Sequence, residues 1–215
     1  SWNGINAFEV IEAANHDYPR NNIPLPSIGV SGYCLTKDPY YLDSSGTEVW
    51  EGRGFPSTWI TARKAADEQM FAAVEVVTRT LGSIPFDPIV VIAGITYKED
   101  VDDCRLSHGR EIARLLRDSG ITTRYWDPSS REDIVDGLSV ERTEASLDGA
   151  DCVIITVPHK EFKEWGRGLN GIGEMRTKFV FDGWGIVRQA PAGVHLIGTG
   201  RGLIPDSDII GAVDD

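Results

Sequence analysis

Short, continuous apolar runs, separated by segments with helical patterning, dominate the sequence after residue 88. Ile89–Ala93 and Cys152–Val157 are apolar almost throughout, as in strands buried on both faces of a parallel sheet. Three more strands are predicted at Thr122–Trp126, Phe179–Phe181 and Val194–Ile197, and helices at Ser107–Asp118, Arg131–Asp136 and His159–Trp165. Strands that alternate with helices predict an α/β fold with a parallel sheet and right-handed crossovers.

The residues before this region show a mainly helical pattern. A short helix is predicted at Ala7–Asn15, and residues 16–27, rich in Pro and Asn, are predicted to form a loop. A second helix is predicted to start at Asp38-Pro39, because proline favours the first helical position. The glycine-bearing segment Asp43–Pro56 is predicted to be a connection.

A long helix is predicted from an N-cap at Ser57 or Thr58 to Leu81, with Gly82 closing it. The Pro-rich segment Ile84–Pro88 then marks the change of pattern. We therefore expect two parts: residues 1–83, the end of a helical domain, and residues 84–215, a Rossmann-like α/β domain.

Composition narrows the class of protein. The chain has 215 residues, a net charge of −12 and a pI of about 4.7, which argues against nucleic acid or an anionic membrane as partner. Three cysteines without metal-ligand spacing fit a reducing cytoplasm, and no metal site is expected. No apolar stretch approaches the roughly 20 residues that span a bilayer, and the start carries no signal peptide.

Cys34 is the candidate nucleophile. It follows a loop with Gly29 and Gly32, whose missing side chains let the backbone bend close to a ligand. A nearby helix N-terminus and Lys37 both favour the thiolate, which is the nucleophilic form. On residue types alone, the favoured interpretation of Cys34 is a small buried hydrophobe, the usual state of a free cysteine.

The loop Gly94–Asp103, after the first strand of the sheet, lies where α/β proteins bind ligands. It lacks the G-x-G-x-x-G dinucleotide pattern but offers Tyr97 as an aromatic face, with Lys98 and Arg105 as cations for phosphates. The alternative is that the two cations pair with the acidic residues nearby, which are Glu99, Asp100, Asp102 and Asp103.

Three ordered motifs resemble those of the UDP-glucose/GDP-mannose dehydrogenase family. The run from Gly29 to Leu42 is similar to its catalytic-cysteine signature. Ala13–Asn15 with Pro19–Ile23 is similar to its upstream motif, and Gly94–Ser107 to its G-x-[AT]-[FY]-K stretch. The similarity is greatest to the branch that acts on UDP-N-acetylmannosamine and UDP-N-acetylglucosamine, although Lys37 is typical of the glucose branch.

The resemblance implies a four-electron oxidation of the C6 alcohol of a nucleotide-sugar to a carboxylate, with reduction of two NAD. Cys34 would attack the intermediate aldehyde, and the resulting thiohemiacetal would be oxidised to a thioester that water hydrolyses. Asp38 would orient that water and Lys37 would stabilise oxyanionic charge. Asp38 can equally be only an N-cap.

The resemblance also implies ligand contacts. Tyr97 and Lys98 match positions that contact the nucleotide-sugar, and Arg105 one that reaches NAD in a neighbouring domain. Arg20 matches an arginine that reaches the sugar nucleotide, in several members from across a dimer interface. Further implied substrate positions are Tyr18, Asn22, Gly29 and Ser31.

Three positions depart from the family pattern. Tyr18 stands where the hexosamine branch often has His, and Ser31 stands for a glycine, which could restrict the loop because serine dislikes positive φ. Trp184 stands where an arginine usually contacts substrate. These departures leave the sugar open between N-acetylhexosamine and glucose.

The family's NAD-binding domain, with G-x-G-x-x-G, is not in this sequence, so the chain is expected to be an inactive C-terminal piece that dimerises through the Ser57–Leu81 helix. One competing hypothesis is a non-catalytic nucleotide-sugar-binding or dimerisation module. Another is a cysteine hydrolase or transferase, which needs a base near Cys34, with the candidates His16, His108, His159 and His195.

Overall fold

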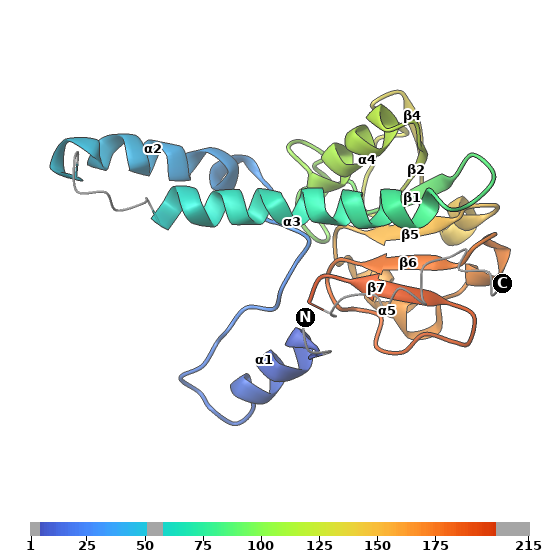
Figure 1. Cartoon of the computed structure of the whole chain (residues 1–215), viewed down its shortest axis with the longest axis horizontal. Helices are drawn as coiled ribbons and strands as arrows, with labels where there is room; N and C mark the ends of the chain where they lie inside the picture. Colours follow the sequence, from blue (N-terminus) through green and yellow to red (C-terminus); the bar gives the residue numbers. More distant parts are fainter. Residues whose placement is uncertain (1–4, 51–57, 201–215) are drawn as a thin grey trace.

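The structure is a computed structural model that describes residues 5–50 and 58–200, with the backbone alone described for residues 43–50. It contains a helical arm and an α/β body (Figure 1). Helices α1 (Ala7–Asn15), α2 (Tyr33–Trp50) and α3 (Thr58–Leu81) come first. Helices α2 and α3 lie side by side and extend from the body in both views, and these two helices with the loop before α2 form the helical arm.

The body is built on a seven-stranded sheet in the order β3-β4-β2-β1-β5-β6-β7. Six strands run parallel, and only the edge strand β3 is antiparallel to its neighbour β4. The strands are β1 (Ile89–Ala93), β2 (Thr122–Trp126), β3 (Ile134–Val135), β4 (Leu138–Glu141), β5 (Cys152–Ile155), β6 (Phe179–Asp182) and β7 (His195–Gly198). The predicted α/β fold with a parallel sheet, preceded by helices, is confirmed.

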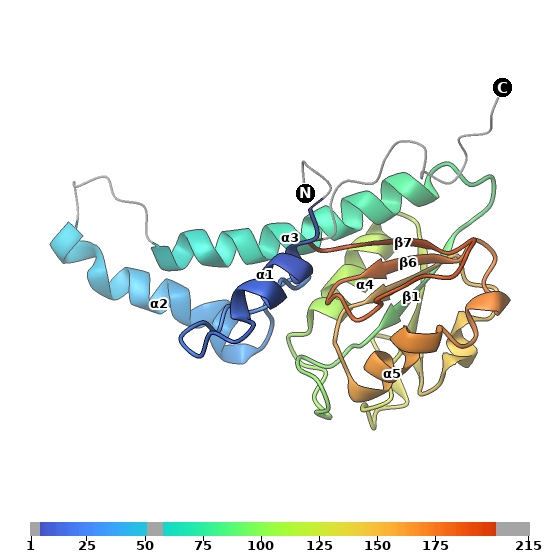
Figure 2. The same ribbon diagram turned by 90° about the horizontal axis from the view of Figure 1, so that it is seen from below.

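Helices cover both faces of the sheet (Figure 2). Helix α3 and helix α4 (His108–Asp118) pack on one face, and helix α5 (Lys160–Gly168) packs on the other. The strand residues alternate between the two cores: Val90 and Ile92 join the α3/α4 core, whereas Val91 and Ala93 join the α5 core. Successive side chains of β1 thus point to opposite faces of the sheet, and both faces are buried, which explains why Ile89–Ala93 is apolar throughout.

Two single-turn 3₁₀ helices, η1 (Glu144–Leu147) and η2 (Ile172–Glu174), connect strands on the α5 side. Helix α4 begins after Ser107, whose hydroxyl accepts a hydrogen bond from the backbone N–H of Gly109 at 3.1 Å. This is an N-cap, as the predicted start of that helix requires.

The predicted helix at Arg131–Asp136 is wrong. The chain forms a tight hairpin there, with β3 and β4 joined through Asp136 and Gly137, both at positive φ (52° and 78°). An Asp-Gly pair in that conformation is the preferred two-residue turn between antiparallel strands. The local turn chemistry therefore outweighs the weak helical pattern.

The predicted start of the second helix is also wrong. Helix α2 begins at Tyr33, so that Pro39 lies inside it, and it continues to Trp50 through most of the predicted connection. Cys34 is therefore in the first helical turn, whereas the sequence predicted it only to lie near a helix N-terminus. The predicted N-cap Ser57 and the rest of the connection, residues 51–57, lie outside the described residues.

Candidate active site

Two loops from distant parts of the sequence meet at the start of α2. The Ser31 hydroxyl donates to the Tyr97 carbonyl at 2.8 Å, and the Gly32 N–H donates to the Leu106 carbonyl at 3.3 Å. Gly32 has φ +98°, and a Cβ there would come within 3.1 Å of the Tyr97 ring. The glycine therefore permits both the bend and the close approach of the two loops.

A pocket of about 860 Å³ lies between these loops. The N-terminal side contributes Ser31, Gly32, Tyr33, Cys34 and Leu35. The α/β body contributes Tyr97, Asp103, Arg105, Leu106 and Arg110. The pocket thus combines a free, exposed thiol with two tyrosine rings and two guanidinium groups.

The predicted strain at Ser31 is not observed. Ser31 is not among the non-glycine residues with positive φ in the described part of the chain. Its hydroxyl instead bonds the two loops together. The substitution of serine for glycine therefore adds a contact at no conformational cost.

Lys37 and Asp38 follow Cys34 on α2 but do not line the pocket within this chain. Lys37 Nζ lies 2.5 Å from Asp38 Oδ1, and 5.0 and 5.3 Å from the ring centres of Tyr33 and Tyr41. The hydrogen bond to Asp38 raises the pKa of Lys37, and nearby Cys34 adds to the effect. Asp38 lies inside the helix rather than before it, so its interpretation as an N-cap is wrong.

Gly29 is a second position where only glycine fits. It has φ +149°, and a Cβ would lie 2.6 Å from the ring of His108. His108 is buried at the start of α4, and burial, with a smaller contribution from the charge of Arg63, lowers its pKa to about 4. The Cys34 loop thus rests against an imidazole that is neutral at physiological pH.

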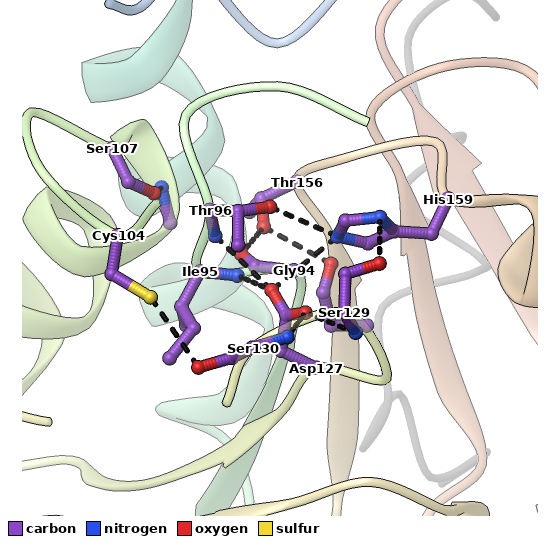
Figure 3. A network of polar contacts seen from close by, with 12 residues as sticks. Gly94, Ile95, Thr96, Cys104, Ser107, Asp127, Ser129, Ser130, Thr156 and His159 are labelled. Carbon is purple, nitrogen blue, oxygen red and sulfur yellow. Dashed lines mark hydrogen bonds and ion pairs between the residues drawn. The ribbon is translucent and has the colours of Figure 1, made fainter. Parts of the chain in front are cut away.

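A buried polar network supports the loop that carries Tyr97 and Lys98 (Figure 3). The Asp127 carboxylate, just after β2, accepts hydrogen bonds from the backbone N–H groups of Ile95 at 2.7 Å and Thr96 at 3.1 Å. It accepts two more from Ser129 and Ser130, and lies 3.3 Å from His159 Nε2. Burial by itself would raise the pKa of Asp127, but the hydrogen bonds have the larger combined effect, so the pKa is lowered overall.

His159, the residue just before α5, completes this network. Its Nδ1 accepts the Asp100 N–H at 2.9 Å, which leaves Nε2 to donate toward Asp127 and toward the Thr96 hydroxyl at 3.1 Å. Thr96 in turn donates to the Lys98 carbonyl at 3.0 Å. The backbone on both sides of Tyr97 is therefore held in place by the buried side chains of Thr96, Asp127 and His159.

The predicted cations behave differently from each other. Arg105 lines the pocket and forms a two-pronged ion pair with Asp103, whose pKa the Arg105 hydrogen bonds lower to about 2. The alternative of pairing with nearby acids is therefore confirmed for Arg105. Lys98 is exposed and does not line the pocket, while Glu99 pairs with Lys163.

Several residues implied by the resemblance are not brought to the pocket. Tyr18, Arg20 and Asn22 are exposed on the segment between α1 and α2, which runs away from α2 before it returns (Figure 1). Trp184 is half-buried, and its indole N–H donates to the Thr156 carbonyl at 2.8 Å. Within this chain, none of the four lines the pocket.

The four histidines proposed as bases for a cysteine hydrolase do not line the pocket of Cys34 either. His159 is committed to the buried network, His108 faces Gly29, and His16 pairs with Asp17 on the surface. His195 lies in the edge strand β7. The structure therefore gives the hydrolase hypothesis no support.

Comparison with known proteins assigns the body of the chain. Residues 91–189 match the description "UDP-glucose/GDP-mannose dehydrogenase family, UDP binding domain". This part of the chain is a UDP-binding domain of that dehydrogenase family. The match covers β1 to the loop after β6, including the network around Asp127.

Relatives of this family also match the helical arm. The UDP-N-acetyl-D-mannosamine dehydrogenase of Pyrococcus horikoshii is 34% identical in a match that covers 93% of this chain. The enzyme of the same name from Methanocaldococcus jannaschii is 30% identical in a match that covers 83%. The structure of the Pyrococcus horikoshii enzyme superposes with a TM-score of 0.76 at 32% identity over 93% of this chain. The structure of the corresponding enzyme from S. aureus gives 0.71 at 29% identity over 92%.

The chain spans about 45% of the length of the Pyrococcus horikoshii dehydrogenase and 39% of the Methanocaldococcus jannaschii one. The superposed structures are likewise matched over 45% and 44% of their lengths. Among the described residues, no helix is long and apolar enough to cross a membrane.

Several residues that shape this pocket were not predicted from the sequence. Arg110 lines the pocket, donates to the Cys104 carbonyl at 2.9 Å and pairs with Asp136. A cation in the first turn of a capped helix, directly after the loop of Tyr97, is the signal that could have found it. Asp127 and His159 act through contacts across 31 to 63 positions, which no local pattern reveals.

Proposed function

We propose that the chain is the C-terminal part of an NAD-dependent UDP-sugar 6-dehydrogenase that converts the C6 alcohol of a UDP-sugar into a uronate. One observation carries the proposal. The exposed Cys34 thiol, in the first turn of α2, opens into a pocket that also holds Tyr97 and two arginines. Its volume of about 860 Å³ lies within the range of small-molecule sites.

The body side of the pocket suits a nucleoside diphosphate. The Tyr97 ring supplies a flat apolar face for a base, and the Arg110 guanidinium supplies planar donors for phosphate oxygens. Lys98, exposed beside Tyr97, is placed to add a second cation once ligand is present. We also propose that the boundary between the helical domain and the nucleotide-sugar domain lies between residues 83 and 84. Helix α3 belongs to the first domain but packs on the sheet of the second.

Cys34 carries the covalent chemistry. Its sulfur bonds to the carbon of the C6 aldehyde, and after oxidation to the thioester it leaves as thiolate when water attacks the same carbon. A thiolate suits both steps because it is a soft nucleophile and an acceptable leaving group. Lys37, held by Asp38, offers positive charge near the sulfur, and Asp38 offers a carboxylate to orient water.

NAD would accept hydride in this reaction. The residue of this chain that fits it is Arg105, whose side chain is 86% exposed at the pocket rim and held by Asp103. A fixed guanidinium that faces solvent suits a phosphate presented by a second domain. The loop Gly94–Asp103 itself lacks the glycine pattern that cradles a dinucleotide.

We further propose a homodimer through helix α3. Trp59 and Phe71 on this helix are 57% and 52% exposed, more than large apolar side chains usually are. In such a dimer Arg20, with Tyr18 and Asn22, serves the pocket of the partner, since these residues do not line their own. Sedimentation of Trp59→Asp would then show monomer at concentrations where the unmodified chain is dimeric, and an unchanged dimer would contradict this interface.

The relatives named for UDP-N-acetyl-D-mannosamine favour a UDP-N-acetylhexosamine as substrate over UDP-glucose. Uronates of this kind are building blocks of polysaccharides, and we place the reaction in their biosynthesis. The three free cysteines fit a cytoplasmic location.

Calorimetric titration with UDP, UDP-N-acetylglucosamine and GDP tests the nucleotide site. We expect saturable binding of the two uridine ligands, loss of binding in Tyr97→Ser and weaker binding in Lys98→Ala. Tyr40→Ser is the matched control, because Tyr40 is exposed on α2 outside the pocket. Equal binding by Tyr97→Ser, or no binding by the unmodified chain, would contradict the proposal.

One observation favours the alternative of a binding or dimerisation module without chemistry. The indole of Trp184 is committed to a backbone carbonyl at the position where the family resemblance places a substrate contact. Iodoacetamide distinguishes the two functions. A dehydrogenase nucleophile should alkylate faster at neutral pH in the folded chain than in the unfolded chain, whereas an equal or slower rate supports the module.

A further inference from the structure

Arg63 is a buried arginine in the part of α3 that faces α2. Only 4% of its surface is exposed, although arginine is almost never buried without partners. Its charge is balanced one turn later by Asp67, with Nη2 2.5 Å from Oδ1 and Nε 3.2 Å from Oδ2. This ion pair uses one edge of the guanidinium and leaves Nη1 free for other acceptors.

Nη1 of Arg63 reaches the segment that carries Cys34. It donates to the Val30 carbonyl at 2.8 Å and to the Leu35 carbonyl at 3.3 Å. These carbonyls lie on either side of Ser31–Cys34, four of the five residues that line the pocket from this side. One guanidinium therefore holds both ends of the turn that presents the thiol.

Pro39 explains why the Leu35 carbonyl needs a donor. In an α-helix the carbonyl of residue 35 accepts the N–H of residue 39, but proline has no N–H and its ring crowds that carbonyl. This carbonyl lies in a partly buried contact, where the lack of a donor is costly. Arg63 supplies from α3 the hydrogen bond that Pro39 removes from α2.

We propose that Arg63 is a positioning residue for Cys34: it replaces the helical hydrogen bond lost at Pro39 and thereby fixes the first turn of α2 against α3. Its relevance to catalysis rests on the proposed function, in which Cys34 is the nucleophile. Since the later part of α3 packs on the sheet through Met70, Ala73 and Val77, Arg63 also ties the thiol to the body. The thiol would then keep its place relative to Tyr97.

Backbone hydrogen exchange of residues 33–42, followed by mass spectrometry on the whole chain, tests this role. In Arg63→Met we expect exchange in this segment to become about tenfold faster, because a hydrogen bond from a charged donor is lost. Arg79→Met is the matched control, since Arg79 is exposed on the same helix. It should leave the segment unchanged.

A second substitution separates positioning from general packing. Pro39→Ala restores an N–H for the Leu35 carbonyl, so Arg63→Met combined with Pro39→Ala should bring exchange of the shared amides to within about twofold of the unmodified chain. A trifluoromethyl label on Cys34 should give one narrow ¹⁹F resonance, broadened or split by Arg63→Met and restored in the double variant. Cys104 and Cys152 are buried and should escape labelling.

Unchanged exchange in Arg63→Met, or a loss that Pro39→Ala does not repair, would overturn the proposal. Should Arg63→Met fail to fold, Arg63→Lys keeps the charge beside Asp67 with a shorter reach, and about threefold faster exchange, repaired by Pro39→Ala, is expected. None of these readouts needs a nucleotide. Failure of UDP binding and failure of the Arg63 role are therefore distinguishable.

Discussion

The two sides of the pocket are built in opposite ways. The Tyr97 side rests on a network in which Asp127 and His159 are fully buried and share hydrogen bonds with each other and with the loop backbone. The Cys34 side is exposed; Ser31 and Gly32 bond it to the body, and Arg63 bonds it to α3. The Tyr97 side is thus fixed by buried side chains of the α/β body, whereas the Cys34 side depends on contacts supplied by other elements.

The largest effect is expected on the buried side. Both carboxylate oxygens of Asp127 accept hydrogen bonds from backbone N–H groups. Asp127→Asn places an NH₂ group against some of these donors, so it should lower the free energy of unfolding by about 3 kcal/mol. Urea denaturation measures this. Asp118→Asn, at an exposed ion pair, should cost less than about 0.5 kcal/mol. Similar costs for the two variants would show that the network does not hold the loop.

The two sides of the pocket should lose stability in different ranges of pH. The pKa of His108 beside the Cys34 loop is lowered to about 4, so its neutral form stabilises the fold above the unfolded value near 6.5. That contribution, about 3 kcal/mol, should be lost between about pH 6.5 and 4, and His108→Gln should flatten this part of the curve.

The Asp127 contribution should fall at lower pH. Its pKa is lowered, so the stability that it provides is complete above the unfolded value near 3.9 and is lost as the pH falls below that value. Urea titrations from pH 7 to 3 check both windows. A curve in which His108→Gln has no effect above pH 4 would refute the separation.

A smaller loss is expected from Gly29→Ala. The new methyl group would meet the His108 ring in a backbone conformation that disfavours side chains, and we expect about 2–3 kcal/mol. Gly120→Ala is a matched control, because Gly120 also has positive φ but has no atom within 4 Å of the added Cβ. Only the conformational part, about 1 kcal/mol, should remain there. Equal losses would mean that the loop does not rest on His108.

The smallest effect is expected at the junction of the two loops. Ser31→Gly removes the hydrogen bond to the Tyr97 carbonyl, so UDP should bind about fivefold more weakly with stability nearly unchanged. Thr36→Ala provides a comparison, since its hydroxyl bonds only within the arm, to the Gly32 carbonyl at 2.9 Å and to the Tyr33 carbonyl at 3.4 Å. Calorimetry of both variants tests whether the junction matters for binding.

The body was more predictable from the sequence than the arm, for a physical reason. Strands such as Ile89–Ala93 are read correctly because burial on both faces leaves a continuous apolar run. The start of α2 was misread because Pro39 favours a helix N-terminus locally, while Arg63, 28 residues from Leu35, supplies the missing bond. The hairpin at Asp136-Gly137 was missed although its turn signal is local.

Protection of Cys34 by ligand tests the central claim most directly. The folded chain is treated with iodoacetamide, with and without a UDP-N-acetylhexosamine, and alkylation at Cys34 is followed by mass spectrometry. If the nucleotide-sugar occupies the pocket between Cys34 and Tyr97, it should slow alkylation at least tenfold, and Tyr97→Ser should abolish the protection. A rate that saturating UDP-sugar leaves unchanged would contradict the assignment of this pocket as the substrate site.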